Sequence, residues 1–503
     1  MQSLRSHTQS RWAALPVLLA GAFMVVLDFF IVNVALPSIA TDLHASESSL
    51  EWVVAGYGLA FAAFLITAGR LGDEHGRRRV YAIGLVLFTV ASLACGLAPT
   101  PTTLVVARIV QGLAGGIVMP QVLSIIGVTY RGPHRVRALS IYGVVLGLAA
   151  VGGQVIGGAL VQTDVLGLGW RGCFLINVPI GLAALALTPR LVPESRAERR
   201  GAIDALGAAM LALGLVAVLL PLIEGRQHGW PAWACISLGL APVILGAFVA
   251  HQARLRRRGE AALLDLGLFH EPAFTGGLVS QLLLASAQAS FFVYLAFYLQ
   301  EGRGLNPLEA GLVFTILAVA YVVVSGPATK LTARHGRAGV GAGGAALAAG
   351  LAVMAAATAD VGVGGSILVL VPGLLLVGAG IGLCFTPLTS TVMAAIEPER
   401  AGAASGAMST TQQVGYGLGV AITGVIFFAH TDIASGFELS LMQLAVLAVG
   451  IVLATALLPS GAKGTLHPQT PLRPNGVDGQ AGRDVGAARR RSGPGLTGCR
   501  APS

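Results

Sequence analysis

The chain has 503 residues, of which 55% are hydrophobic and only 11% charged, and its formal net charge is +9. Soluble domains carry about 25% charged residues, so this composition excludes an ordinary water-soluble fold. Apolar runs of roughly 20 residues recur along the chain and predict membrane-spanning helices, whereas barrel strands would show alternating segments of about ten residues. We therefore expect an all-α polytopic membrane protein.

Fourteen apolar runs are long enough to cross a bilayer. In chain order the spans are predicted near 13–37, 50–69, 80–98, 103–129, 137–161, 173–192, 204–223, 233–250, 273–299, 309–329, 338–357, 366–390, 402–429 and 439–458. The first run is too long for a signal peptide and lacks a small-residue cleavage site. The five cysteines show no paired spacing, so we expect neither a disulfide nor a metal site.

Lysine and arginine residues indicate the orientation, because positive loops favour the cytoplasmic side. With the N-terminus inside, the inner segments before residue 459 hold 21 of them, whereas the outer loops hold only Arg171, Arg226 and Arg303. The positive charge therefore indicates topology rather than a nucleic-acid partner. We expect a multi-pass protein of the cytoplasmic membrane with both termini in the cytoplasm.

A weak internal repeat relates two parts of the chain. The segment ATKLTARHGRAG (Ala328–Gly339) aligns with AGRLGDEHGRRR (Ala68–Arg79) at an offset of 260 residues. Parallel duplication of a six-helix unit gives two bundles related by an axis along the membrane normal. We predict a cytoplasmic N-terminus at 1–12, a six-helix bundle at 13–192, two additional linker helices at 204–250, a second bundle at 273–458 and a disordered cytoplasmic tail at 459–503.

The stretch GRLGDEHGRRRV (69–80), between the second and third spans, concentrates charge in a chain that has little of it. Gly69, Gly72 and Gly76 favour a tight reversal of the chain. The arginines hold this turn at the inner face, and Asp73 can pair with an arginine or cap the next helix. A plain positive stop signal is the alternative, although such a signal needs neither carboxylates nor spaced glycines.

Two charged residues fall inside apolar runs. A charge at the bilayer centre costs roughly 2.5–3.5 kcal/mol on insertion scales, so Asp28 is expected to line a cavity and to load and release protons. A helix-packing hydrogen bond, with Asn33 as a helper, is the alternative. Arg108 cannot deprotonate and would bias a nearby carboxylate or water chain, with Gln111 one turn below, unless it snorkels to the outer end of its span.

Glycines at Gly143, Gly147, Gly153 and Gly157 give the fifth span a smooth face, which favours close packing against another helix. Gly415, Gly417, Gly419 and Gly424 give the thirteenth span a comparable patch.

Four of these stretches resemble signatures of the major facilitator superfamily. Gly69-x-Leu71-x-Asp73-x-x-Gly76-Arg77-Arg78 is similar to its cytoplasmic loop signature, and the second copy carries Ala333 where Asp73 stands. The stretches LDFFIVNVALPSI (Leu27–Ile39), RIVQGLAGGIVMP (Arg108–Pro120) and GVVLGLAAVGGQVIGGAL (Gly143–Leu160) resemble the first-, fourth- and fifth-helix signatures of its fourteen-helix drug:proton antiporters. The resemblance covers residues 12–458, and Gln154 stands where the fifth-helix signature has proline.

The resemblance implies a major facilitator fold, with two six-helix bundles plus two extra central helices, and a role for each motif. It implies proton coupling by Asp28 and Arg108, and a loop that latches the cytoplasmic side through Gly69, Asp73, Gly76, Arg77 and Arg78. It implies a conformational-switch helix with Gly143, Gly147, Gly153, Gln154, Gly157 and Gly158. Polar and aromatic residues that could line a central cavity for substrate, or merely pack, are Tyr57, Gln111, Gln288, Tyr294 and Gln412.

The expected function is proton-coupled efflux of drug- or antibiotic-like amphipathic small molecules by alternating access. The partners would be the substrate, protons and the lipid bilayer, with no nucleic acid and no cofactor, and the transporter would act as a monomer. One alternative is a major facilitator transporter of a native metabolite with different coupling. A membrane-embedded enzyme is a more remote alternative, because the sequence shows no nucleophile–base set and no phosphate-loop motif.

Overall fold

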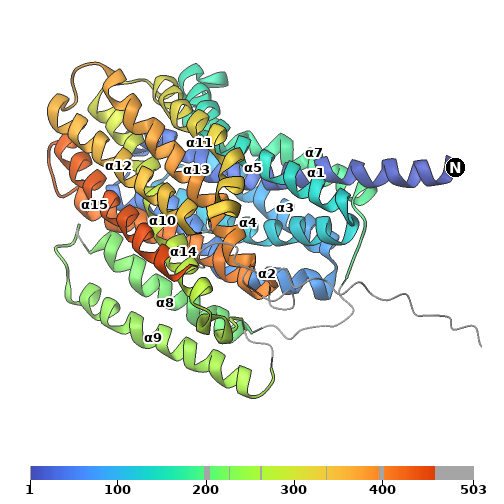
Figure 1. The fold of residues 1–503 in the computed structure, drawn as a ribbon. Helices are drawn as coiled ribbons and strands as arrows, with labels where there is room; N and C mark the ends of the chain where they lie inside the picture. The colour runs from blue at the N-terminus through green and yellow to red at the C-terminus, as the bar shows by residue number, and fades with distance from the viewer. Residues whose placement is uncertain are drawn as a thin grey trace, which may run out of the picture. The chain divides into compact units, whose positions relative to one another are not determined.

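The computed structural model describes residues 2–196, 204–225, 227–260, 263–335, 337–394, 396 and 401–458. Over these ranges the chain forms helices joined by short turns, and no strand is present in them (Figure 1). The tail predicted at 459–503 lies outside the described residues.

The first bundle contains α1 (Gln2–Leu43), α2 (Glu47–His75), α3 (Arg77–Gly96), α4 (Pro101–Thr129), α5 (Pro133–Thr163), η1 (Val165–Gly167), η2 (Gly169–Arg171), α6 (Gly172–Leu175) and α7 (Asn177–Leu191). The additional pair is α8 (Ala205–Glu224) and α9 (Ala232–Arg257). The second bundle contains η3 (Leu266–His270), α10 (Pro272–Phe297), η4 (Tyr298–Gly302), α11 (Pro307–His335), α12 (Arg337–Val361), η5 (Ile367–Leu370), α13 (Val371–Ala394), α14 (Ala401–Phe427), α15 (Ile433–Ala454) and η7 (Thr455–Leu457).

Each of the fourteen predicted spans coincides with a helix or with two helices in tandem, as α6 and α7 do. Among the described residues, thirteen helical segments are long and apolar enough to cross a membrane. The fourteenth is α14, which carries the polar sequence STTQQ near its middle. The prediction of an all-α polytopic membrane protein is therefore confirmed.

The two halves repeat one another at the motif that suggested duplication. In the first half α2 ends at His75 and α3 begins at Arg77, and in the second half α11 ends at His335 and α12 begins at Arg337. Both pairs of bounds differ by the predicted 260 residues.

Helices pack mainly within their own half, and two pairs make most of the contacts between the halves. In the first bundle α1 lies against α5 and α2 against α4, and in the second α10 lies against α14 and α12 against α13. Most of the contacts that join the bundles are made by α5 with α11 and by α2 with α14 (Figure 1), and α1 adds contacts with α10 and α11.

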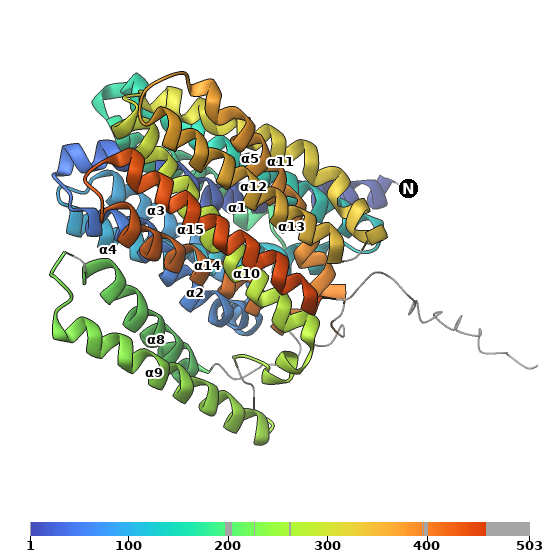
Figure 2. The same ribbon diagram turned by 60° about the vertical axis from the view of Figure 1, so that its left-hand side comes forward.

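The additional helices form an antiparallel pair beside α2 and α14 (Figure 2). Only α8 of this pair packs closely on the bundles, and it places Leu215, Leu219 and Ile223 in one apolar cluster with Ala55 of α2 and Ala421 of α14. The indole Nε1 of Trp52 on α2 donates a hydrogen bond to Glu224 Oε1 at the end of α8, over 3.1 Å.

We name the two ends of the bundles after residues that lie there: the Gly76 face, where α2 turns into α3, and the Ser46 face, where α1 turns into α2. The bundles meet near the Ser46 face. A Cβ on Gly158 of α5 would collide with the backbone of Pro307, and one on Gly311 of α11 would lie 2.6 Å from the Gln154 carbonyl oxygen. Nearer the Gly76 face, Gly143 has no atom within 4 Å of a Cβ position.

Candidate functional site

Asp28 on α1 and Arg108 on α4 form an ion pair in the interior of the first bundle. Arg108 Nη1 donates to Asp28 Oδ2, and both side chains are 0% exposed. A charge buried at membrane depth is costly unless it is paired. The structure thus brings together the two charged residues that the sequence places inside apolar runs.

Neutral donors complete the coordination of the carboxylate. Asp28 Oδ1 accepts from Gln111 Nε2 and from Asn177 Nδ2, each over 2.8 Å. The Ser92 hydroxyl accepts from the same two amide groups, each over 3.0 Å, and donates to the Phe174 carbonyl over 2.9 Å. Helices α1, α3, α4 and α7 therefore each contribute a side chain to one buried polar cluster.

The guanidinium of Arg108 is held by further contacts beside the ion pair. Its Nε donates to the Val53 carbonyl over 3.0 Å, and its Nη1 also donates to Gln111 Oε1 over 2.8 Å. Its Cζ lies 4.3 Å from the ring centroid of Tyr57, a favourable cation–π distance. Arg108 is therefore a structural centre of the cluster and does not snorkel to the end of its span.

Sequence reasoning missed two members of this cluster and proposed another residue in their place. Asn33, suggested as the helper of Asp28, is 2% exposed and makes no hydrogen bond to it. The amide that does so is Asn177, from the sixth span, and Ser92 supports it. Both are polar residues within apolar runs, and that was the signal available in the sequence.

The charged stretch 69–80 is largely helical, which corrects the expected loop. Helix α2 continues to His75, and the reversal is confined to Gly76, whose φ is +105°. Gly69 and Gly72 lie inside α2, where Gly72 leaves room for the Gln121 side chain of α4. Neither glycine reverses the chain: Gly72 allows close packing against α4, whereas a Cβ on Gly69 would lie 3.8 Å from Pro120, an ordinary contact.

Asp73 and the arginines around Gly76 form ion pairs at the Gly76 face. Asp73 Oδ1, near the end of α2, lies 2.7 Å from Nη2 of Arg77, the first residue of α3. Glu194, beyond the end of α7, accepts the backbone N–H of Arg78 over 3.0 Å and lies 3.7 Å from its Nε. Glu194 was not singled out from the sequence, because only the fold places it beside this turn.

Glycines on the Ser46 half of α5 let it pack closely against α1 and α11. Cβ atoms on Gly153 and Gly157 would lie 3.1 Å from Phe30 Cβ and 2.7 Å from Ile31 Cγ1 of α1, respectively. Gln154, at the expected proline position, is 1% exposed and donates from Nε2 to the Phe30 carbonyl over 3.0 Å. Gly147, like Gly143, has no atom within 4 Å of a Cβ position.

The residues considered for a substrate cavity separate into two groups. Tyr57, Gln111 and Tyr294 are at most 1% exposed and are fully used by the polar cluster or by helix packing. Gln288 and Gln412 are partly exposed and flank Tyr416, whose hydroxyl accepts from Gln412 Nε2 over 2.8 Å.

The ring of Tyr416, on α14, stacks on Phe29 of α1, with centroids 4.8 Å apart. The neighbouring residue Phe30 also contacts the second bundle, since its ring centroid lies 5.5 Å from that of Phe292 on α10. Aromatic rings of the first bundle thus meet aromatic and amide groups of the second bundle directly after Asp28 in the chain.

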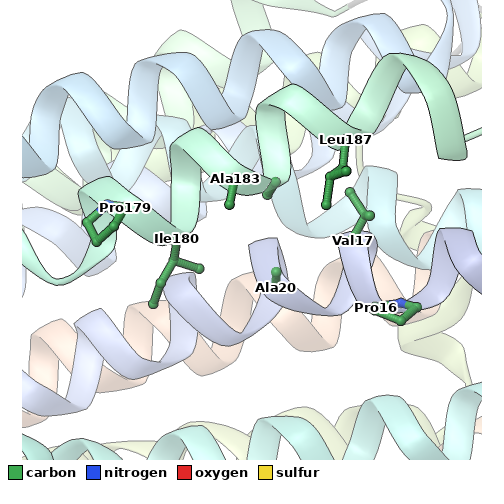
Figure 3. Close-up of a pocket in the computed structure, with 8 residues that line it drawn as sticks. Pro16, Val17, Ala20, Pro179, Ile180, Ala183 and Leu187 are labelled. Atoms are coloured by element: carbon green, nitrogen blue, oxygen red, sulfur yellow. The ribbon is translucent and has the colours of Figure 1, made fainter.

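A separate apolar cavity of about 420 Å³ lies between α1 and α7. It shares no residue with the polar cluster, and its walls are entirely apolar (Figure 3): Pro16, Val17, Ala20, Pro179, Ile180, Ala183, Ala184 and Leu187. Across the described part of the chain, no three His, Cys, Asp or Glu side chains gather as they would around a metal ion. The four cysteines in that part are free thiols.

Comparison with characterised proteins identifies relatives over most of the chain. It is 38% identical over 420 residues to the probable actinorhodin transporter of Streptomyces coelicolor, covering 83% of this chain and 72% of that protein. It is 34% identical over 472 residues to the cephamycin export protein of Amycolatopsis lactamdurans, covering 92% and 95%. It is also 34% identical to the tetracenomycin C resistance and export protein of Streptomyces glaucescens, covering 82% and 76%.

Solved structures share the fold at low sequence identity. A crystal structure of the xylose transporter XylE from E. coli, in a partially occluded inward-open conformation, superimposes with a TM-score of 0.62 at 16% identity and covers 91% of this chain and 99% of that one. A bacterial homologue of the lysosomal transporter Spinster, inward-facing, gives a TM-score of 0.61 at 17% identity over 89% and 96% of the two chains.

The sequence profile of the Major Facilitator Superfamily matches residues 18–420, which is most of the described chain. Together with the two six-helix bundles and the additional pair, this match establishes the family that the loop and helix signatures suggested. The chain is a multi-pass membrane transporter that belongs to the Major Facilitator Superfamily.

Proposed function

We propose that this protein is a proton-coupled efflux transporter that exports an amphipathic, drug- or antibiotic-like small molecule across the cytoplasmic membrane. The observation that carries the proposal is the Asp28–Arg108 pair, a titratable carboxylate buried in the bundle interior. The names of three relatives, which refer to actinorhodin, cephamycin and tetracenomycin C, support natural-product export.

In this proposal Asp28 carries the proton and Arg108 governs its release. The guanidinium stabilises the carboxylate, so any displacement of Arg108 makes protonation easier. A proton that enters under a membrane potential of about 100 mV releases roughly 2.3 kcal/mol. One or two protons per cycle therefore suffice to drive uphill export, and no nucleotide or cofactor is needed.

The proposed orientation follows the positive charges, which place the Gly76 face and both termini in the cytoplasm. The bundles meet near the Ser46 face, so the described state is then inward-facing. Alternating access would close the Gly76 face, where Gly69, Asp73, Gly76, Arg77 and Arg78 form the proposed latch. Helix α5 would be the switch, sliding on Gly143, Gly147, Gly153, Gln154, Gly157 and Gly158.

We propose that substrate binds between the bundles beside Asp28. Gln288, Gln412 and Tyr416 offer amide and hydroxyl groups from the second bundle, and Phe29 offers an aromatic face from the first. This lining suits molecules with a flat apolar body and a few polar groups. Tyr57, Gln111 and Tyr294 would support this site from behind rather than line it. The transporter would work as a monomer, since each chain carries both bundles.

The test measures proton movement in proteoliposomes that hold an acid interior. A lipophilic cation such as ethidium is added outside to wild type and to Asp28→Asn, and the collapse of the gradient is followed. Collapse in wild type alone supports antiport through Asp28. If neither protein responds to ethidium while wild type responds to a metabolite panel, drug export is wrong and the transporter assignment stands. An equal response in both proteins makes Asp28 structural.

A further inference from the structure

The two amide side chains that bind Asp28 differ in what their carbonyl oxygens do. Gln111 Oε1 accepts from Arg108 Nη1 over 2.8 Å and from Cys95 Sγ over 3.4 Å. Asn177 Oδ1 is buried and accepts no hydrogen bond in the described part of the chain. Within the described residues Asn33, Gln121, Gln154 and Gln413 also have a buried side-chain oxygen without a donor, but among these amides only Asn177 is bonded to Asp28.

The hydrogen-bond pattern fits only the ionised form of Asp28. A carboxylate accepts at both oxygens, as Asp28 does from Arg108, Gln111 and Asn177. A protonated carboxyl group becomes a donor and needs an acceptor of its own. Every side chain that contacts Asp28 in this cluster presents a donor to it, so the acid form has no acceptor unless a side chain rearranges.

Asn177 can provide that acceptor by rotating its amide half a turn. The rotation would turn the unpaired Oδ1 toward Asp28. Ser92 would lose one donor but keep that of Gln111, and its own O–H would still donate to Phe174. The Asn177 NH₂ group would lose its two present acceptors, Asp28 and Ser92. Gln111 cannot do the same, because its carbonyl is held by Arg108 and its rotation would place two donors against one another.

Other titratable groups close to Asp28 do not offer this alternative. Arg108 has no acceptor atom. The Tyr57 hydroxyl donates to the Val25 carbonyl over 3.1 Å. The thiols of Cys95 and Cys173 are directed to Gln111 Oε1 and to the Gly157 carbonyl, respectively.

We propose that Asn177 is a positioning residue that serves both protonation states of Asp28. Its NH₂ group donates to the carboxylate, and after a half-turn its carbonyl accepts from the acid. This inference rests on the proposed proton exchange at Asp28 and adds the element that gives the acid form an acceptor, at the cost of exchanging the unpaired Asn177 carbonyl for an unpaired NH₂ group.

The test compares Asn177→Leu, which removes both functions, with Asn177→Ser, whose hydroxyl can donate and accept. Asn33→Leu is the matched control: Asn33 is 2% exposed, also has an unpartnered side-chain oxygen in the described structure, and does not contact the cluster. Infrared difference spectra between acid and alkaline pH are recorded on reconstituted protein. Asp28→Asn identifies the carboxyl band of Asp28.

We expect wild type and Asn33→Leu to show an amide-carbonyl difference band together with the Asp28 carboxyl band. Asn177→Leu should lack the amide band, and Asp28→Asn should lack both. In transport, Asn177→Leu should lower proton-coupled turnover about tenfold with little change in KM, as expected when only a step after binding is affected. Asn177→Ser should recover part of that rate.

An amide band that persists in Asn177→Leu, or unchanged turnover in that variant, overturns the inference while leaving proton exchange at Asp28 in place. If wild type shows no carboxyl band that Asp28→Asn removes, the proposed function itself is wrong. If wild type shows no amide band and turnover is lost in both Asn177→Leu and Asn177→Ser, Asn177 has a packing role only and the inference is wrong.

Discussion

The Nε of Arg108 donates to the backbone carbonyl of Val53 over 3.0 Å, which fixes α4 to α2 at the level of the ion pair. The same guanidinium donates to Asp28 and Gln111 and stacks over Tyr57. One side chain therefore binds a carboxylate, an amide, a backbone carbonyl and an aromatic ring.

This geometry predicts that Arg108→Lys does not preserve function, although the charge is unchanged. The planar guanidinium directs N–H groups to several acceptors at once, whereas the compact ammonium group of lysine does not. In Arg108→Lys the Val53 carbonyl or Gln111 Oε1 therefore loses its donor. An unpaired buried acceptor costs about 1–3 kcal/mol. We expect a lower thermal midpoint in detergent and substrate-driven proton release reduced about tenfold or more. Wild-type rates in Arg108→Lys would show that charge alone is sufficient.

Two glycines on α5 predict opposite effects of the same substitution. Gly158 lies against the Pro307 backbone, whereas Gly143 has open space around it. Leucine at 158 should therefore force the Ser46 ends of α5 and α11 apart, and leucine at 143 should leave the described state intact but obstruct closure at the Gly76 face. Thiol labelling of cysteines introduced at either face measures which side is open. Equal labelling patterns for Gly158→Leu and Gly143→Leu would contradict the packing difference.

Gly76 predicts a stability effect at the turn between α2 and α3. Its φ of +105° suits glycine, and a Cβ there would lie 2.9 Å from the Glu194 carboxyl carbon. A side chain in the left-handed region costs about 1–2 kcal/mol, so Gly76→Ala should lower the thermal midpoint. Gly143→Ala, at an uncrowded helical position, is the control. The prediction fails if both variants unfold at the wild-type temperature.

The start of α8 predicts a pH-dependent contribution to stability. Partial burial raises the pKa of the Asp204 carboxyl group. The carboxylate accepts hydrogen bonds from Gln252 Nε2 over 2.7 Å, from His251 Nε2 over 2.9 Å and from the Gly207 N–H over 2.8 Å. These bonds outweigh the effect of burial and hold the pKa below its ordinary value. Because the pKa of Asp204 is lower in the folded than in the unfolded chain, ionised Asp204 stabilises the fold at pH values above the pKa of the unfolded chain, about 3.9. This stabilisation is lost as the pH falls through the pKa of the folded chain.

Thermal midpoints between about pH 6 and about pH 3 test this linkage. Wild type should lose stability more steeply over that range than Asp204→Asn, which has already lost the contribution at neutral pH. A steeper loss in Asp204→Asn would assign the acid sensitivity to other carboxylates.

The sequence predicts the spans well because bilayer thickness fixes how long each apolar run must be. It also identifies Asp28 and Arg108, since a charge stands out in an apolar run. It does not identify Asn177 as the neighbour of Asp28, or Glu194 as the neighbour of Arg78, because which faces of distant helices meet depends on packing that apolar periodicity does not encode.

The stretch 69–80 shows the same limit at a local scale. Its glycines and charges suggest a loop, yet only Gly76 has a backbone that requires glycine. Gly72 is explained by Gln121, a residue 49 positions later on α4 that fills the space beside it. The same residue type serves two purposes within five positions, and only the tertiary contacts distinguish them.

Helix α8 belongs to neither bundle, yet it touches α2 of one and α14 of the other. Its link to α2 includes the Trp52–Glu224 hydrogen bond, whereas its contact with α14 is apolar, with Leu219 Cδ1 lying 3.3 Å from a Cβ position on Gly417. In the proposed alternating-access motion, displacement at the apolar α14 contact would cost less than breaking the Trp52–Glu224 hydrogen bond to α2. The additional helices α8 and α9 would then move together with the first bundle, while α14 of the second bundle shifts along the apolar surface of α8.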